Sequence, residues 1–147
     1  SSASIINLGA MTQPRGIRNN NPLNIRKGSK WKGEKDTQTD SQFEQLDSME
    51  YGLRAALILI RNYIDGHNSA HRKFDSIESL ISRWAPPSEN ATRNYIDVVA
   101  GRVGIHPRQR LNFSDREMMI RLVQAMAHVE CGQEIERALI ESAYSMI

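Results

Sequence analysis

Helical periodicity governs the chain from residue 47 onward, and it restricts the possible folds to a mostly α class. Apolar residues recur there three and four positions apart, which places them on one face of an α-helix. The first stripe consists of Leu53, Ala56, Leu57, Ile60 and Ile64. Its helix opens near Asp47 and ends at Asp65-Gly66, because glycine readily adopts the left-handed conformation that closes helices.

Residues that cap or break helices bound the later stripes. The expected caps are Asp75 or Ser76, then Asn90 or Thr92, then the capping box Ser114-Asp-Arg-Glu117. The expected ends are Pro86-Pro87, Gly104 and Gly132. A last stripe follows Gly132 and runs to Met146, so the sequence predicts a chain of consecutive helices after residue 47.

The first third of the chain lacks this periodicity. Residues 15–26 contain four asparagines within six positions and a proline, which forbids a continuous helix. Residues 27–42 are short, polar and glycine-containing, so we expect at most a small β-hairpin near residues 24–46. Residues 1–10 resemble a tag or upstream segment before Met11, and residues 11–147 fit a single domain.

Composition narrows the classes of function. A formal net charge of +2 and a pI near 8.8 are too weakly basic to indicate specific nucleic-acid binding. No apolar run reaches the length of a membrane span, and the single cysteine, Cys131, excludes an internal disulfide. The pair His67 and His71 has helical spacing but sits in an expected loop, so we predict no metal and no cofactor. Basic residues crowd positions 15–35, which indicates either a surface for an anionic polymer or a solvated loop.

Glu130 is a lone carboxylate on the apolar face of the predicted helix that ends at Gly132. At 100° per residue it lies within about 40° of Val123 and Met126, so it should project toward the interior. Burial raises the pKa of a carboxyl group, which suits a proton donor working near neutral pH. The alternative is a glutamate at a helix end that bends out into solvent.

The segment Trp84-Ala-Pro-Pro-Ser-Glu-Asn-Ala-Thr92 joins an aromatic residue to a rigid turn and several hydrogen-bonding side chains. Tyr95 follows one helical turn later. An aromatic face beside amide and hydroxyl groups suits a sugar ring. The alternative is a joint between two helices in which Trp84 belongs to the core and Asn90 is a cap.

Three blocks together resemble a family of small phage and prophage virion proteins. The blocks are Arg15-Gly-Ile-Arg-Asn-Asn-Asn-Pro-Leu-Asn-Ile-Arg26, then Trp31-Lys-Gly33 with Phe43–Ser48 and Tyr51–Ala55, then Trp84–Thr92 with Tyr95. Members of this family are usually labelled structural proteins or lysozyme-like peptidoglycan-degrading enzymes.

A weaker resemblance is to flagellar-type and autolysin glucosaminidases of the lysozyme superfamily. Asn21–Arg26 is similar to the turn that follows the catalytic glutamate helix in those enzymes. Nothing before Arg15 supplies that helix, whereas Leu122–Gly132 looks like it at the other end of the chain. The resemblance therefore implies a mostly α, single-domain lysozyme-like fold that is circularly permuted, with Glu130 packed beside the asparagine-rich turn.

The resemblance implies a peptidoglycan-degrading glycosidase of phage or prophage origin, whether muramidase, glucosaminidase or lytic transglycosylase. Glu130 would be the general acid and Asp40 the base or stabilising carboxylate. The alternatives for the second carboxylate are Glu34, Asp36, Glu44 and Glu89. The residues expected to hold the sugar are Asn21, Asn24, Glu89, Asn90, Thr92 and Tyr95.

The competing hypothesis is a non-catalytic virion or structural protein. Such a protein would bind cell-wall glycan or other phage virion proteins through the same surface. On either hypothesis the partners are peptidoglycan glycan strands and virion proteins. Because no signal peptide is evident, we expect the chain in the virion, or in the host cytoplasm before release, and its action in the periplasm or cell wall.

Overall fold

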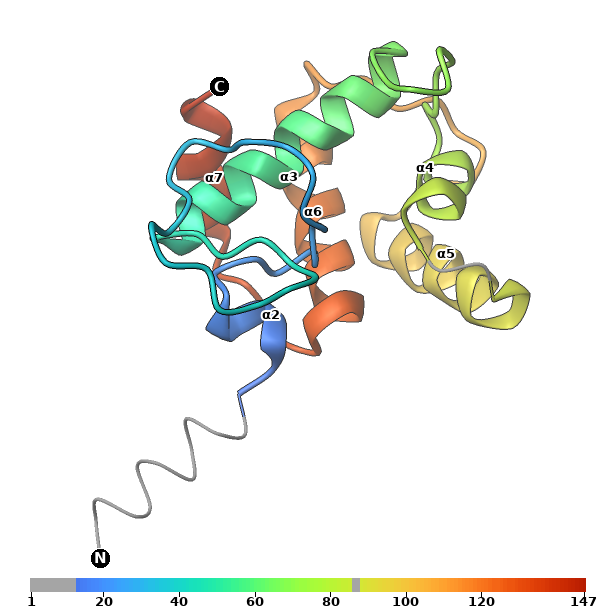
Figure 1. Ribbon diagram of the computed structural model, residues 1–147. Coiled ribbons are helices and arrows are strands. Elements are labelled where there is room, and N and C mark those ends of the chain that lie inside the picture. Colours follow the sequence, from blue (N-terminus) through green and yellow to red (C-terminus); the bar gives the residue numbers. More distant parts are fainter. Residues whose placement is uncertain (1–12, 86–87) are drawn as a thin grey trace, which may run out of the picture.

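The computed structural model describes residues 13–85 and 88–147, which are mostly α-helical (Figure 1). The helices are α2 (Arg15–Arg18), α3 (Met49–Asp65), α4 (Ile77–Trp84), α5 (Glu89–Val103), α6 (Arg116–Cys131) and α7 (Arg137–Ser145). No strand forms among the described residues, and two isolated antiparallel bridges join Arg26 to Phe43 and Glu34 to Leu46. The mostly α class is therefore confirmed, and the expected hairpin is reduced to these two bridges. The residues interpreted as a tag, 1–10, lie outside the described part.

Side-chain caps start α3, close to its predicted opening near Asp47, and α4, at one of its two predicted caps. The Ser48 hydroxyl accepts a hydrogen bond from the Tyr51 backbone N–H at 3.3 Å. Ser76 and Ser79 form a reciprocal capping box, which selects Ser76 over the alternative Asp75. These bonds satisfy N–H groups that the first turn of a helix leaves without partners.

α5 begins earlier than the predicted caps. Its N-cap is Ser88, whose carbonyl accepts the Thr92 N–H at 2.8 Å and so closes the first turn. Asn90 and Thr92 therefore lie inside the helix, and neither is its cap. The predicted cap is wrong because Ser88 already supplies the first helical carbonyl.

The start of α6 is shifted by one residue from the predicted capping box. Its N-cap is Asp115, whose carboxylate accepts the Met118 N–H at 3.2 Å. The Ser114 hydroxyl instead donates to Asn112 Oδ1 at 2.7 Å. Because the preceding turn engages the serine, the aspartate beside it takes over the cap.

Buried amide side chains hold the loop between α2 and α3 together in place of a β-ladder. Asn21 Nδ2 donates to the carbonyls of Ile25 at 2.9 Å and Glu44 at 3.1 Å, and Asn21 Oδ1 accepts the Ile25 N–H at 2.9 Å. Gln45 Nε2 donates to Asn19 Oδ1 at 3.0 Å. Asn19, Asn21 and Gln45 are all buried, so these bonds satisfy groups that water cannot reach. The asparagine-rich block is therefore the frame of this loop.

This loop lies directly against α3 at Gly52. A Cβ atom added to Gly52 would lie 1.7 Å from the backbone oxygen of Asn20, which no real contact allows. Asn20 has a left-handed backbone with φ of 52°, and its Nδ2 donates to the Leu46 carbonyl at 2.9 Å. The missing side chain of Gly52 thus fixes how closely the loop approaches the helix.

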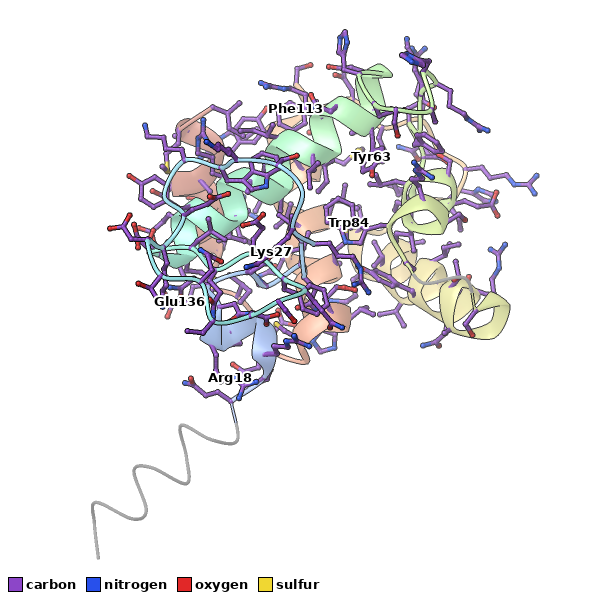
Figure 2. All side chains as sticks on the ribbon, in the orientation of Figure 1. Arg18, Lys27, Tyr63, Trp84, Phe113 and Glu136 are labelled. Atoms are coloured by element: carbon purple, nitrogen blue, oxygen red, sulfur yellow. The ribbon has the colours of Figure 1, made fainter. Side chains whose placement is uncertain are left out.

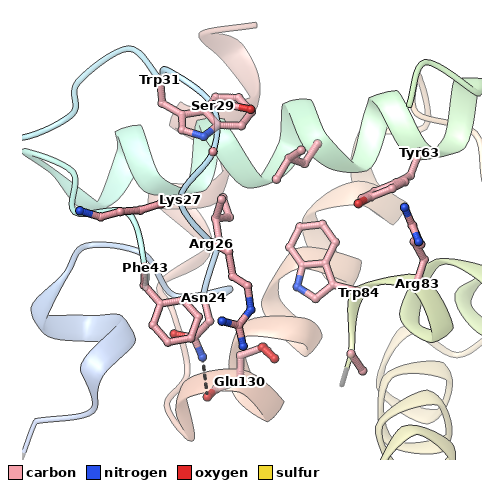
Figure 3. A pocket seen from close by; sticks show the side chains of 14 residues that line it. Asn24, Arg26, Lys27, Ser29, Trp31, Phe43, Tyr63, Arg83, Trp84 and Glu130 are labelled. Atoms are coloured by element: carbon pink, nitrogen blue, oxygen red, sulfur yellow. Dashed lines mark hydrogen bonds between the residues drawn. The ribbon is translucent and has the colours of Figure 1, made fainter. Parts of the chain in front are cut away.

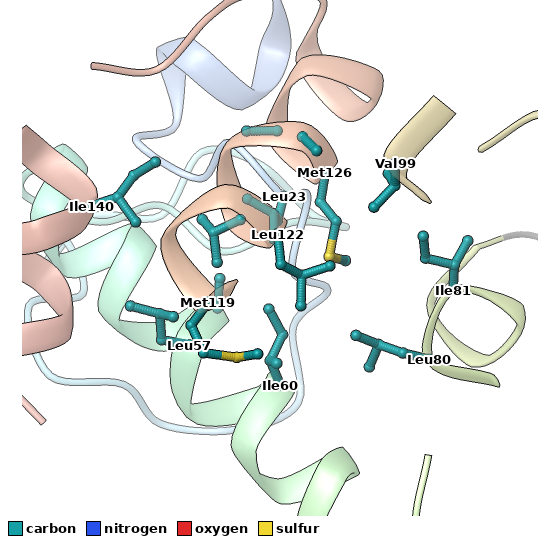
Figure 4. Close-up of a cluster of buried hydrophobic side chains, with 14 of the residues drawn as sticks. Leu23, Leu57, Ile60, Leu80, Ile81, Val99, Met119, Leu122, Met126 and Ile140 are labelled. Carbon is teal, nitrogen blue, oxygen red and sulfur yellow. The ribbon is translucent and has the colours of Figure 1, made fainter. Parts of the chain in front are cut away.

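α6 runs through the centre of the molecule and joins two groups of helices (Figure 1). α5, with α4 packed on it, lies on one side, and α2, α3 and α7 contact the other. Leu122 and Met126 of α6 are fully buried, with Val99 of α5 on one side and Leu57 and Ile140 on the other (Figure 4). No helix in the described residues is long and apolar enough to span a membrane.

Candidate functional site

A pocket of about 600 Å³ opens between the loop before α3 and the C-terminal end of α4 (Figure 3). The loop contributes residues 24–29, Trp31 and Phe43. Helix α3 contributes Tyr63, and α4 contributes Trp84. The last turn of α6 brings Glu130 to the same space. Segments from both ends of the chain therefore meet at one concave site of a size typical for ligand binding.

Glu130 has the electrostatic character of a proton donor. Its side chain is partly buried, and burial raises the pKa of its carboxyl group to about 7 because the charged form is disfavoured. A hydrogen bond from the Asn24 side chain moderates this rise. Near neutral pH a large fraction of the molecules therefore carries a protonated Glu130.

Asn24 connects the asparagine-rich turn to Glu130 across 106 positions of sequence. Its Nδ2 donates to the Glu130 backbone oxygen at 3.4 Å (Figure 3). Asn24 has a left-handed backbone with φ of 53°, and its amide turns toward the end of α6. Helix α2 packs against the same end of α6. A Cβ atom added to Gly16 of α2 would lie 3.4 Å from the Cβ atom of Cys131.

Asn21 and Tyr95 lie close to this arrangement but outside the pocket wall. The amide of Asn21 is fully used in holding the loop, as described above. Tyr95, on α5, is 5% exposed, and its hydroxyl has no hydrogen-bond partner in the described part of the chain. Burial, with a further contribution from the charge of Glu130, raises the pKa of Tyr95 well above its usual value. The phenol therefore lies within the electrostatic reach of the carboxylate.

Asp40, expected as the second catalytic carboxylate, is held in a separate ion pair. Both its oxygens lie 2.6 Å from Arg15 nitrogens, and Asn19 Nδ2 donates to it at 2.9 Å. The backbone N–H groups of Gln42 and Phe43 add two more bonds. These contacts, with Arg15 foremost, hold the pKa of Asp40 well below its usual range. Asp40 is not among the described residues that line the pocket, and its geometry fits a structural clamp.

Glu34, Asp36 and Glu44, the alternative second carboxylates in the loop before α3, also lie outside the pocket wall. Glu44 is buried, and burial together with neighbouring Glu34 raises its pKa, while Lys27 partly offsets the rise. Glu34 Oε1 accepts the Trp31 backbone N–H at 2.8 Å. Asp36 is exposed. Among the described residues that line the pocket, Glu130 is therefore the only carboxylate.

The predicted sugar-binding residues of the Trp84–Thr92 segment fall at the start of α5. Glu89 and Asn90 are in its first turn, and their side chains lie outside the described residues, as do Pro86 and Pro87. Thr92 is partly buried, one turn before Tyr95.

Trp84, whose aromatic face was one candidate for a sugar, lines the pocket, as do four residues that were not predicted as site residues: Trp31, Phe43, Tyr63 and Arg83. Trp84 Nε1 donates to the Leu23 carbonyl at 3.2 Å, and its ring meets Tyr63 edge-on at 6.1 Å. Trp31 and Phe43 belong to the sequence blocks on which the family resemblance rests, so their place in the site could have been predicted from that resemblance. No sequence pattern marked Tyr63 or Arg83 as a site residue, because each lies on an ordinary amphipathic helix. Within the described chain, no group of three or more His, Cys, Asp or Glu residues could hold a metal ion.

Comparison with known proteins identifies a bacteriophage relative. The chain is 40% identical over 122 residues to Protein P5 of Pseudoalteromonas phage PM2, a match that covers 80% of this chain and 71% of the relative. The chain belongs to the Protein P5 family. No protein-family model matches the sequence. The relative supports the phage part of the resemblance drawn from the sequence, while the name Protein P5 says nothing about catalysis.

Proposed function

We propose that this member of the Protein P5 family is a phage peptidoglycan-degrading glycosidase that uses Glu130 as its general acid. The observation that carries the proposal is a carboxylic acid with a pKa near 7 in a pocket with aromatic walls. A proton donor that remains partly protonated at neutral pH is what cleavage of a glycosidic bond requires. The contact between Asn24 and the end of α6 keeps that donor in place.

In the proposed reaction the glycan chain lies across the pocket, with a sugar ring against the aromatic face of Trp84. Glu130 donates its proton to the oxygen of the scissile bond as that bond breaks, and an oxocarbenium-like centre develops on the sugar. In a lytic transglycosylase the 6-hydroxyl oxygen of the substrate attacks the anomeric carbon and closes the product ring, while Glu130, now a carboxylate, takes the proton of that hydroxyl. This route needs no second carboxylate. A hydrolase needs a second carboxylate that directs water, for which Glu89, the first residue of α5, is the remaining candidate.

The proposed fold assignment is a lysozyme-like core in permuted order. Its support is the meeting of the last turn of α6 with the turn at Asn24, since the glucosaminidases that the sequence resembles carry their catalytic helix before a similar turn. The muramidase, glucosaminidase and transglycosylase alternatives differ only in the bond cut and in the chemistry of the new end.

The test compares wild type with Glu130→Gln on purified peptidoglycan, with mass spectrometry of the released fragments. Glu136→Gln is the matched control, because Glu136 is exposed at the start of α7 and caps it with no side-chain bond (Figure 2). We expect release by wild type and the control, and a loss of at least 100-fold for Glu130→Gln. The released ends identify the bond, and equal release by all three proteins would refute the proposal.

The second candidate function is a non-catalytic component of the phage virion. It is supported by the relationship to a phage protein whose name carries no activity. On this proposal the chain is found in purified particles, where it contacts other virion proteins, and the pocket binds wall glycan without cutting it. Unchanged peptidoglycan after long incubation with wild type, together with binding to it, would favour this candidate.

A further inference from the structure

Three cationic side chains line the pocket, and only Lys27 has a carboxylate, that of Glu44, near enough to affect its pKa. Arg26 and Lys27 come from the loop before α3, and Arg83 comes from the last turn of α4 (Figure 3). Trp84 lies between Arg26 and Arg83, and Glu130 lies beside the end of the Arg26 side chain (Figure 3). None of the three is ion-paired with a carboxylate in the part of the chain that the structure describes, whereas many arginines away from the pocket are paired with acids.

Neutral groups hold the two guanidinium groups in place. Arg26 lies 5.0 Å from the centre of the Phe43 ring. Arg83 lies 5.9 Å from the Phe74 ring, and its Nη2 donates to Ser69 Oγ at 3.4 Å. Contacts of this kind orient a guanidinium without neutralising it, so both groups keep their full charge.

Glu130 does not neutralise these cations. No ion pair joins it to Arg26, Lys27 or Arg83, and burial keeps its carboxyl group substantially protonated at neutral pH. A cation bound directly to Glu130 would lower the pKa and weaken the acid. The positive charges instead occupy the walls, and the pocket has a net positive charge.

We infer that the pocket selects a glycan that bears carboxylates, which pair with Arg26 and Lys27 on one wall and with Arg83 on the other. This inference rests on the proposed function and names the substrate class of the same site. A guanidinium pairs with a carboxylate through two parallel hydrogen bonds, while an aromatic face accepts the sugar ring that carries it. In peptidoglycan the carboxylates belong to the lactyl group of muramic acid or to the stem peptides, whereas a polymer of N-acetylglucosamine has none.

The test measures binding to the inactive Glu130→Gln protein, so that the ligand stays intact, and follows tryptophan fluorescence or heat. Three oligosaccharides of equal length are compared at low ionic strength: one with stem peptides, one with free lactyl groups after removal of the peptides, and a neutral N-acetylglucosamine oligomer. We expect at least tenfold tighter binding of an anionic form than of the neutral one, with a ratio that falls as salt is added. The tighter of the two anionic forms identifies the carboxylate.

Substitutions locate the effect in the pocket. Arg83→Gln and Arg26→Gln should each lower the preference for the anionic oligosaccharide several-fold, and Arg83→Lys should retain part of it. Arg18→Gln is the matched control, because Arg18 is exposed on α2 and is not among the residues that line the pocket. These exposed positions should tolerate the changes without loss of folding, which circular dichroism checks.

The outcomes separate this inference from the proposed function. Equal affinity for anionic and neutral oligosaccharides would overturn the inference, even where wild type cuts peptidoglycan. Charge-dependent binding without any cleavage by wild type would support the inference and refute the proposed activity. Tighter binding of a single-stranded oligonucleotide of equal charge would also overturn it, because the cations would then serve a nucleic acid.

Discussion

At the scale of single residues, the molecule stabilises opposite charge states in two of its carboxyl groups. Asp40 receives two guanidinium bonds from Arg15 and further bonds from Asn19 and two backbone N–H groups, so it stays ionised. Glu130 is partly buried with one amide partner, and this burial favours its neutral form. Sequence position alone does not separate these roles, because both residues are isolated acids among polar or apolar neighbours.

The raised pKa of Glu130 predicts a specific dependence of stability on pH. The folded state holds the Glu130 proton up to about pH 7, whereas the unfolded chain releases it near its ordinary value of 4.5. The contribution of Glu130 to stability is therefore complete at acidic pH and is lost as the pH rises through 7. Glu130→Gln cannot ionise, so we expect it to match wild type near pH 4 and to exceed it by about 3 kcal/mol at pH 8.

The measurement is urea unfolding of both proteins across pH 4 to 8. Glu136→Gln serves as the control, because Glu136 is exposed and its substitution should leave the pH dependence of wild type unchanged. Parallel stability curves for wild type and Glu130→Gln would show that Glu130 is ionised normally in the folded state. That result would also remove the physical basis for its proposed role as a general acid.

At the scale of elements, the position of the loop between α2 and α3 depends on the absence of a side chain at Gly52 of α3. The loop has two isolated bridges and a set of amide bonds in place of a sheet, so its position is set by contact with the helix. This loop forms one wall of the pocket and brings Asn24 to Glu130. A substitution that disrupts the contact between this loop and α3 should therefore change the geometry of the pocket and also lower the stability of the fold.

Gly52→Ala tests this contact. The added methyl group would meet the Asn20 carbonyl at 1.7 Å, so either the loop or the helix must move. We expect a loss of about 3 kcal/mol in the free energy of unfolding, and a decrease in the proposed glycosidase activity, because the loop also carries Asn24. Chemical denaturation measures the first effect, and release of peptidoglycan fragments measures the second.

Gly101→Ala provides the matched control on α5. Nothing lies within 4 Å of a Cβ at Gly101, and the residue is exposed inside a helix. Alanine should stabilise the helix there by roughly 0.5–1 kcal/mol through its higher helical propensity. Equal and small effects of the two substitutions would mean that the loop does not rest on Gly52.

At the scale of the whole molecule, the sequence predicts where helices form better than it predicts which segments pack against each other. Apolar stripes are local, so α3 begins close to its predicted start near Asp47 and α4 begins at Ser76, one of its two predicted caps. The predicted caps of α5 and α6 were wrong, because Ser88 and Asp115 occupy those positions. The inward orientation of Glu130 was likewise predicted from the apolar stripe of its own helix. Tyr63 and Arg83 could not be assigned to the pocket from the sequence. An apolar stripe indicates which face of a helix is buried, but it does not indicate which other segment packs against that helix.

The central position of α6 predicts that the two groups of helices unfold together. Leu122 and Met126 are fully buried between them, so neither group keeps its core without α6. Trp31 reports on the loop beside α3, and Trp84 reports on the end of α4. In each single-tryptophan protein, Trp84→Phe and Trp31→Phe, the fluorescence midpoint should coincide with the midpoint from far-ultraviolet circular dichroism.

Leu122→Ala extends this test to the core itself. The cavity left on α6 should cost about 2–5 kcal/mol, and it should lower the fluorescence and circular dichroism midpoints of each single-tryptophan protein together. Comparing the two signals within one protein cancels the effect of the removed tryptophan. A shift confined to one tryptophan would show two separately folding parts, and the pocket that spans them would then open and close with their docking. A shared shift means that Glu130 and the walls around it are held by one cooperative core.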